Sequence, residues 1–248
     1  MFEIKIDDSK YWKNCIDAIA NIVDEGLFNI AKDGISLKAI DPSGISMVSF
    51  SIPNKAFSKY ELDKPISIGL DISNLIKILS TSRQNEYIIM KNTGNKFNIE
   101  FVGEHSSRRY KLPIIDVKTE DVKEPNVPVP ESVIHVKSDG LKEILKDANS
   151  LSTYVGFKTT KDSFVVFAKS DIGELEEEHM NDAEIIKKMD ITKPASVTFN
   201  VEYLVRIINA SPQGSFISLG LKIDDPIKIN YKIGDAELTY YLAPYIES

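Results

Sequence analysis

No known catalytic motif can be found among the residues that could do chemistry. The chain contains no G-x-x-x-x-G-K-[ST], G-x-G-x-x-G, H-E-x-x-H, C-x-x-C or G-x-S-x-G. Its three histidines, His105, His135 and His179, lie far apart and lack the regular spacing of metal ligands. The single cysteine, Cys15, falls on an apolar helical stripe, where a small buried side chain is expected rather than a nucleophile. The sequence therefore predicts no catalytic residue, no metal site and no cofactor.

Acidic pairs leave one enzymatic alternative open. Asp7 and Asp8, Asp224 and Asp225, and the single Asp41 could supply carboxylates to Mg²⁺ in a metal-dependent enzyme built on duplicated α+β domains. Such residues more commonly cap helices or form turns. A binding or scaffold protein is therefore the favoured class.

Composition agrees with an ordinary globular protein. The 248 residues are 42% hydrophobic and 27% charged, with a formal net charge of −7. No apolar run reaches the length of a membrane span, and the start M-F-E-I-K-I-D-D lacks the regions of a signal peptide. One cysteine excludes an internal disulfide framework, so an intracellular location is expected. An acidic chain that bound nucleic acid would need a locally basic face.

The two halves of the chain repeat each other with an offset of 129 residues. K-D-G-I-S-L-K-A-I at 32–40 matches K-D-S-F-V-V-F-A-K at 161–169, and I-S-I-G-L-D-I-S-N-L-I-K-I-L-S at 66–80 matches A-S-V-T-F-N-V-E-Y-L-V-R-I-I-N at 195–209. The offset holds over about 70 residues without a gap. Two similar domains are therefore predicted, although two α+β domains with generic patterning remain an alternative.

Each half reads as strand, helix and further strands, repeated twice. Trp12, Ile16, Ile19 and Val23 form an apolar stripe at helical spacing, after possible cap residues at 7–9. Further helices are predicted near 72–82, 139–149 and 201–210, and strands lie between them. The expected fold is α+β, with antiparallel sheets backed by helices.

The stretch E-P-N-V-P-V-P-E-S at 124–132 separates the two copies. Three prolines keep it extended and deny it ladder hydrogen bonds, so it is expected to lie over the surface. The predicted organisation is a first domain at 1–117, a connecting loop at 118–131 and a second domain at 132–248.

Five segments together resemble the proliferating cell nuclear antigen family of sliding clamps, in its archaeal form. They are M-F-E at the start, L-K-A-I-D-P-S-G-I-S-M at 37–47, F-S-K-Y-E-L at 57–62, K-L-P-I-I-D-V at 111–117 and Y-Y-L-A-P-Y-I-E at 240–247. The resemblance covers essentially the whole chain. It implies a clamp without enzymatic activity, in which three two-domain chains form a ring around double-stranded DNA with sheets outside and helices lining the hole.

The resemblance also implies partners and a location. The partners are DNA polymerase, an ATP-driven clamp loader, flap endonuclease, DNA ligase and similar replication and repair enzymes, which dock through short motifs. The location would be the cytoplasm, at the nucleoid, in an archaeon, or the nucleus in a eukaryote. A specialised subunit that works only in a heterotrimer is an alternative within the same family.

The residues predicted to face DNA lie mainly on polar helix faces. A ring is held on DNA by topology, so only its hole-facing surface needs positive charge. The candidates are Lys10, Lys13, Asn14, Lys77, Arg83, Lys142 and Lys146. A merely solvated helix face is the alternative for each lysine. Glu202 stands where the family can carry a basic residue, so uneven contact around the hole is expected.

Two strands of opposite charge are predicted to join neighbouring subunits. A head-to-tail interface needs two different, complementary edges. S-S-R-R-Y-K-L at 106–112 is basic and the stretch at 171–179 is acidic. The resemblance makes them the paired edge strands, with acids of the third helix against arginines nearby. The predicted interface residues are Arg83, Arg108, Arg109, Lys111, Glu143, Asp147, Glu174, Glu176 and Glu178.

A partner-docking pocket is implied beside the proline-rich stretch. The resemblance maps it to Ile40, Gly44, Ile45, Met47, Val127, Asp224, Pro226, Tyr241, Ala243, Pro244 and Ile246. Exposed apolar residues around a flexible methionine suit a surface that accepts many partners. The alternative is that Ile40, Ile45 and Met47 are core residues of strands.

Overall fold

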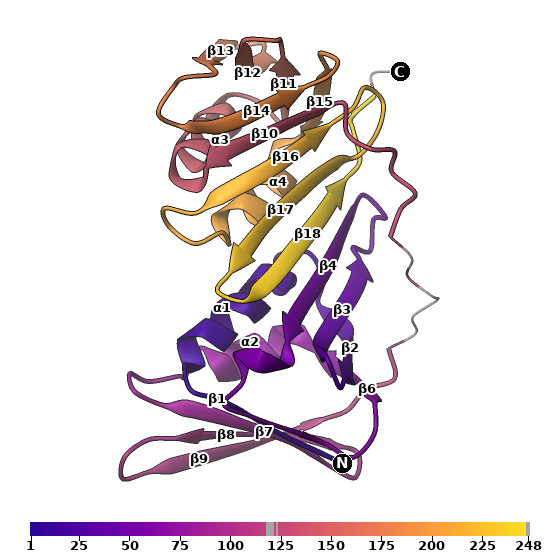
Figure 1. The fold of residues 1–248 in the computed structure, drawn as a ribbon, viewed down its shortest axis with the longest axis vertical. Coiled ribbons are helices and arrows are strands. Elements are labelled where there is room, and N and C mark those ends of the chain that lie inside the picture. Colours follow the sequence, from indigo (N-terminus) through magenta and orange to yellow (C-terminus); the bar gives the residue numbers. More distant parts are fainter. Residues whose placement is uncertain (118–121, 123, 247–248) are drawn as a thin grey trace. The chain divides into compact units, whose positions relative to one another are not determined.

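The computed structural model describes residues 1–117, 122 and 124–246, and it divides the chain into two compact units (Figure 1). The first comprises Met1–Ile40, Val48–Lys123 and Ile233–Leu238, and the second comprises Asp41–Met47, Glu124–Lys232 and Thr239–Ser248. Within the described ranges, no helix is long and apolar enough to cross a membrane.

The first unit is built from nine strands and two α-helices. A five-stranded antiparallel sheet has the order β5-β1-β7-β8-β9, and four further strands have the order β4-β3-β2-β6. The helices are α1 (Ser9–Ala20) and α2 (Ile72–Leu79), and a 3-10 turn, η1, covers Asn54–Ala56. The strands are β1 (Phe2–Ile6), β2 (Glu25–Ala31), β3 (Gly34–Ile40), β4 (Ser46–Pro53), β5 (Lys59–Leu62), β6 (Ile66–Asp71), β7 (Tyr87–Thr93), β8 (Lys96–Val102) and β9 (Ser107–Pro113).

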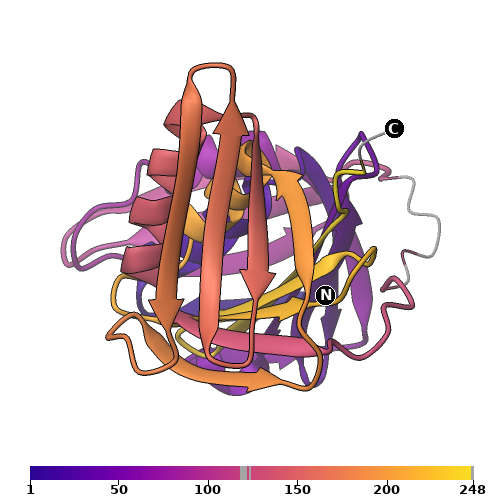
Figure 2. The same ribbon diagram turned by 90° about the horizontal axis from the view of Figure 1, so that it is seen from above.

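The second unit has the same plan. One antiparallel sheet has the order β13-β12-β11-β15, and a second runs β14-β10-β16-β17-β18. Helix α3 (Ser138–Leu151) packs on the first of these sheets, behind the β12–β13 hairpin in Figure 2, and α4 (Val201–Asn209) packs beside α3. The strands are β10 (Ser132–Lys137), β11 (Tyr154–Thr159), β12 (Ser163–Ser170), β13 (Gly173–Met180), β14 (Ile186–Ile191), β15 (Ser196–Asn200), β16 (Phe216–Leu221), β17 (Ile227–Ile233) and β18 (Ala236–Leu242).

The internal repeat predicted from the sequence is confirmed element by element. Helix α1 begins at residue 9 and α3 at 138, and α2 begins at 72 and α4 at 201, so both pairs differ by 129. Strands β9 and β18, at 107–113 and 236–242, differ by the same number. The predicted antiparallel sheets backed by helices are likewise present.

The helices form where sequence signals place them. The Asp8 carboxylate accepts hydrogen bonds from the backbone N–H groups of Lys10 and Tyr11, and Asp71 and Asn200 cap α2 and α4 in the same way. On α1 the stripe of Trp12, Ile16 and Ile19 is buried, and Cys15 is buried beside it. Burial raises the pKa of the Cys15 thiol to about 12, which keeps it protonated and unreactive.

Residues 124–131 of the proline-rich stretch contain no helix or strand, as predicted, whereas its last residue, Ser132, begins β10. Residues 124–131 carry no regular structure, and Val127 makes a tight turn with its N–H 2.7 Å from the Pro125 carbonyl oxygen. Pro130 covers Gly220 of β16, at a distance that leaves no room for a larger side chain on that glycine. Residues 118–121 and 123 of the predicted connecting loop lie outside the described residues.

Candidate docking site and assembly edges

A buried aspartate shapes the loop between β3 and β4. Asp41 is 6% exposed, and its carboxylate accepts hydrogen bonds from the backbone N–H groups of Ser43 (3.1 Å), Ile45 (2.8 Å) and Ser46 (2.6 Å). Gly44 takes φ +70°, which a glycine adopts without strain. This arrangement fixes the loop so that the Ile45 side chain stays 40% exposed.

A tyrosine of helix α4 anchors the same aspartate. The Tyr203 hydroxyl donates to Asp41 Oδ2 at 2.9 Å, across 162 residues of chain. Desolvation and this hydrogen bond raise the pKa of Tyr203, so it remains the donor at neutral pH. The guanidinium of Arg206 lies 5.9 Å from the centre of the Tyr203 ring. Helix α4 and the 41–47 loop are thus tied together within the second unit.

The C-terminal tail is held against this loop. The Ala243 N–H donates to the Ile45 carbonyl oxygen at 2.9 Å. Tyr241 is buried, and its hydroxyl donates to Glu124 of the proline-rich stretch at 3.2 Å. Burial and the Glu124 charge raise the pKa of Tyr241 to about 12, which preserves this link through the neutral range.

The predicted docking residues therefore gather in the second unit. Loop, tail and proline-rich stretch are joined by the bonds above, and the hollow described below brings Asp224 of the β16–β17 turn to Pro244 and Ile246. Ile246 is 69% exposed, and Val127 and Pro226 are half-buried. Met47 is only 4% exposed, so it can form only the base of the docking site. Ile40 ends β3 and is exposed, but it is counted with the first unit.

Two exposed aliphatic residues near the predicted site were not predicted. Val129, two residues beyond Val127, is 86% exposed, and Ile223, beside Asp224, is 43% exposed. Their positions next to Pro128 and in a D-D-P turn were the available sequence signals. Val129 is a better candidate than Val127 for direct contact with a guest, because far more of its surface is open.

Beside this site lies a hollow of about 480 Å³ on the sheet β13-β12-β11-β15. Its lining comes from Ser152 before β11, from β11, β12 and β15, and from the β16–β17 turn and the tail. Tyr245 closes one side, because its ring stacks on Tyr154 with centroids 3.8 Å apart and its N–H donates to the Thr198 carbonyl at 2.8 Å.

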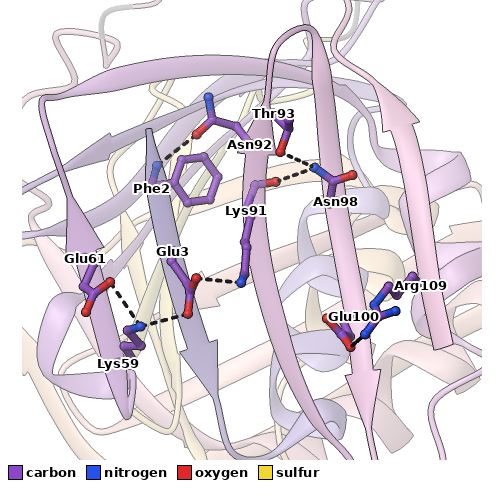
Figure 3. A network of polar contacts seen from close by, with 10 residues as sticks. All are labelled: Phe2, Glu3, Lys59, Glu61, Lys91, Asn92, Thr93, Asn98, Glu100 and Arg109. Carbon is purple, nitrogen blue, oxygen red and sulfur yellow. Dashed lines mark hydrogen bonds and ion pairs between the residues drawn. The ribbon is translucent and has the colours of Figure 1, made fainter. Parts of the chain in front are cut away.

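Strand β9 is the basic edge of the five-stranded sheet, and its side chains alternate between two faces. Arg109 and Lys111 are exposed, and Arg109 pairs with Glu100 of β8 at 2.7 Å (Figure 3). On the same face Glu3 bridges Lys59 and Lys91, and these bonds lower its pKa. The outer face of this sheet is therefore charged along several strands.

Arg108 points to the other face of β9. Its guanidinium bonds Glu86 Oε2 at 2.6 Å and Thr81 Oγ1 at 3.1 Å, and it lies 4.9 Å from the centre of the Phe101 ring. The Glu86 side chain is 4% exposed, so Arg108 neutralises a buried carboxylate of its own chain. This intrachain pair gives Arg108 a structural role, and its predicted place at the subunit interface stays a prediction.

Strand β13 is the acidic edge of the sheet in the second unit. Glu174, Glu176 and Glu178 alternate with Leu175 and Glu177 and are the exposed set. Only β12 pairs with β13 among the described strands, which leaves its second edge open. The other predicted interface residues, Arg83 after α2 and Glu143 and Asp147 on α3, are also exposed.

The helix faces retain some of the predicted cations and use others internally. Lys10, Asn14, Lys77 and Lys146 are exposed. Lys13 is ion-paired with Asp17 on α1. Lys142 donates to the Ser211 carbonyl oxygen at 2.7 Å, and desolvation lowers its pKa, so this lysine fits a structural role better than contact with DNA. Arg206 is exposed on α4 and was missed, although the offset of 129 pairs it with Lys77.

Within the described residues, no group of three or more His, Cys, Asp or Glu side chains could hold a metal ion. Four of the five acidic residues weighed for Mg²⁺ have other contacts, and the fifth, Asp224, is exposed. Asp8 caps α1, Asp7 pairs with Lys5 at 3.0 Å, and Asp225 pairs with Lys222 at 3.2 Å. Asp41 is occupied by the hydrogen bonds of its loop.

Comparisons with known proteins cover nearly the whole chain. Residues 1–123 match the family model of the proliferating cell nuclear antigen N-terminal domain, and residues 129–246 match that of the C-terminal domain. The DNA polymerase sliding clamp of Methanococcus vannielii is 31% identical over 97% of this chain and 98% of its own length. That of Thermococcus gammatolerans is 28% identical over 99% of both chains.

Solved structures show the same fold. The crystal structure of proliferating cell nuclear antigen from Thermococcus kodakaraensis superposes with a TM-score of 0.93 at 24% identity, covering 99% of this chain and 100% of that one. The A. fulgidus protein bound to the C-terminal region of FEN-1 gives 0.90 at 23% identity, with full coverage of both. The chain therefore belongs to the proliferating cell nuclear antigen family and is a homologue of the archaeal DNA polymerase sliding clamps.

Proposed function

We propose that three copies of the chain close head to tail into a ring that encircles duplex DNA and tethers DNA polymerase and other replication enzymes to it. In this role the protein catalyses no reaction of its own. Its contribution is to hold a partner at the template.

The observation that carries the ring is the pair of open edges. Strand β9 ends one sheet and exposes Arg109 and Lys111, while β13 ends another and exposes three glutamates. An unpaired edge is a template for strand addition, and opposite charges favour β9 meeting β13 over either edge meeting itself. Two unlike edges on one chain generate a heterologous assembly, which closes when the rotation per subunit permits.

The exposed cations of the helices support passage of DNA. Lys10, Lys77, Lys146 and Arg206 provide a few contacts to phosphate rather than a dense basic patch. Phosphate contacts carry no sequence information and weaken with salt, which suits a protein that slides. The net charge of −7 is consistent with retention by topology, since strong neutralisation of phosphates is not needed.

The docking site supports the tether. The 41–47 loop, the tail and the proline-rich stretch are fixed to each other and leave apolar side chains exposed, as a groove for a short partner motif requires. A relative bound to the C-terminal region of FEN-1 makes a flap endonuclease one expected partner. DNA polymerase, clamp loader and DNA ligase are the others.

Charge reversal on β9 tests the ring. The double variant Arg109→Glu with Lys111→Glu is expected to convert a species of about three times the 27.8 kDa chain mass into smaller ones, measured by light scattering. The control is Lys187→Glu with Lys188→Glu on β14, which makes the same charge change at another exposed edge and should leave the mass unchanged. A variant that keeps the mass of the trimer contradicts the proposed edge. A wild-type protein that is monomeric alone points to a heterotrimer subunit.

A further inference from the structure

The hollow on the sheet β13-β12-β11-β15 has an aromatic floor. In the register of β11 and β12, Gly156 lies opposite Phe167. A Cβ atom on Gly156 would come within 2.0 Å of the Phe167 ring, so this ring lies flat over the glycine and keeps a broad face toward the hollow. The stacked Tyr154 and Tyr245 add two more rings at the side. An apolar side chain would be well accommodated on this surface.

The hollow is continuous with the predicted docking site. Asp224, Pro244 and Ile246 belong to the docking prediction and also line the hollow. The tail is pinned to β15 through Thr198 and to the 41–47 loop through Ala243, so it forms a fixed wall between them. A peptide that leaves the docking site past Pro244 therefore enters the hollow.

The rim carries negative charge. Asp224 is exposed and makes no ion pair among the described residues, whereas Asp225 beside it is paired with Lys222. Lys169 is the one cation among the described residues that line the hollow, and Glu174 neutralises it. Glu176 and Glu178 lie opposite Phe167 and Val165 across β12 and β13, and side chains of such cross-strand pairs share a face. In the proposed ring these glutamates meet the basic β9 edge of a neighbouring copy, so Asp224 is the acid that remains for a guest. A cationic guest is complementary to this rim.

We propose that this hollow receives a basic segment that flanks the docking motif of a partner enzyme. An apolar side chain of the segment covers Phe167 and Tyr154, and a lysine or arginine next to it pairs with Asp224. This inference rests on the proposed docking function and adds a second contact to it. Such a contact would give partners with the same docking core different affinities, depending on the sequence beside that core.

Fluorescent peptides with one docking core and different flanks provide the test. The core is taken from the C-terminal region of an archaeal flap endonuclease, and its flank is Lys-Leu-Arg-Lys, Glu-Leu-Glu-Glu or Gly-Ser-Gly-Ser, placed at either end in separate peptides. On the wild-type protein at 50 mM NaCl, one of the two basic-flanked peptides is expected to bind about fivefold more tightly than its Gly-Ser counterpart in fluorescence anisotropy. The acidic flank should weaken binding.

Asp224→Asn separates charge from shape. Asp224 has φ +61°, a conformation that asparagine also tolerates, so this variant keeps the turn and removes the carboxylate. It should cut the gain from the basic flank, measured as the ratio of the basic-flank affinity to the Gly-Ser affinity on the same variant, about threefold. Asp182→Asn, an exposed residue of the same unit that does not line the hollow, is the matched control and should leave this ratio unchanged.

The outcomes distinguish this inference from the docking proposal. Equal affinities for all flanks, or a gain that survives Asp224→Asn, overturn the inference alone, because the core still binds. If the Gly-Ser peptide does not bind the wild-type protein at all, the docking site itself is refuted and the inference with it. Loss of the gain in Tyr154→Ala as well as in Asp224→Asn would support both halves of the contact.

Discussion

Arg108→Ala is expected to lower the free energy of unfolding by about 3 kcal/mol, because it leaves a buried carboxylate without its counter-charge. Glu86 has a side chain that is 4% exposed, and Arg108 reaches it at 2.6 Å. Among the described residues, the other donor to this carboxylate is the backbone N–H of Arg83, at 2.7 Å. Urea denaturation followed by circular dichroism measures the change.

The neighbouring arginine provides a matched control. Arg109→Ala removes the same kind of side chain one residue along β9, but the Arg109 side chain is 69% exposed and its partner Glu100 lies on the outer face. Exposed pairs contribute about 1 kcal/mol or less, so a small change is expected. Equal losses of unfolding free energy in Arg108→Ala and Arg109→Ala would contradict the inward position of Arg108. If both variants reduce the mass of the proposed trimer equally, Arg108 contributes to the subunit interface as predicted.

Asp41→Ala is expected to weaken binding of a docking-core peptide at least about tenfold, equivalent to about 1.4 kcal/mol. The carboxylate holds three backbone N–H groups of the 41–47 loop, and without it those groups must find water. The loop then loses its fixed shape, and ordering it again opposes binding. Fluorescence anisotropy with the Gly-Ser-flanked peptide measures this change.

Tyr203→Phe is the graded control for Asp41→Ala. It removes only the hydroxyl that donates to Asp41 and keeps the ring beside Arg206, so a loss of about two- to fivefold is expected. Unchanged affinity in Asp41→Ala would show that the loop does not contribute to docking. Tyr203 also lies on the helix that carries Arg206. The hydrogen bond between Tyr203 and Asp41 therefore links a candidate DNA-facing surface to the docking loop within one unit.

The fold was predictable because its signals are local or repeated. The helical stripes, the possible cap residues at 7–9 and the offset of 129 place the four α-helices of the described residues to within a few residues. Strand edges were also accessible, because the charge of 106–112 and 171–179 is visible in the sequence. Arg108 and Arg109 lie on opposite faces because side chains alternate along a strand. Treating the charged run as a single patch overlooks this alternation.

What could not be predicted depends on contacts between residues distant in the chain. Asp41 meets Tyr203 across 162 residues, and Lys142 meets Ser211 across 69. No local pattern marks these pairs, so a lysine on a polar helix face cannot be told from one that ties two helices together. The sequence of the C-terminal tail was enough to predict a docking site. It did not predict that Tyr245 stacks on Tyr154 and closes one side of the hollow.

Primer extension on a long, singly primed circular template tests the tethering claim most directly. A replicative DNA polymerase of an archaeal relative is bound with clamp loader and ATP, and a trap added with the nucleotides limits synthesis to one binding event. With the wild-type chain, products should be many times longer than with the polymerase alone, and Arg109→Glu with Lys111→Glu should abolish the increase. Products of equal length with and without the chain would contradict its role as a sliding clamp.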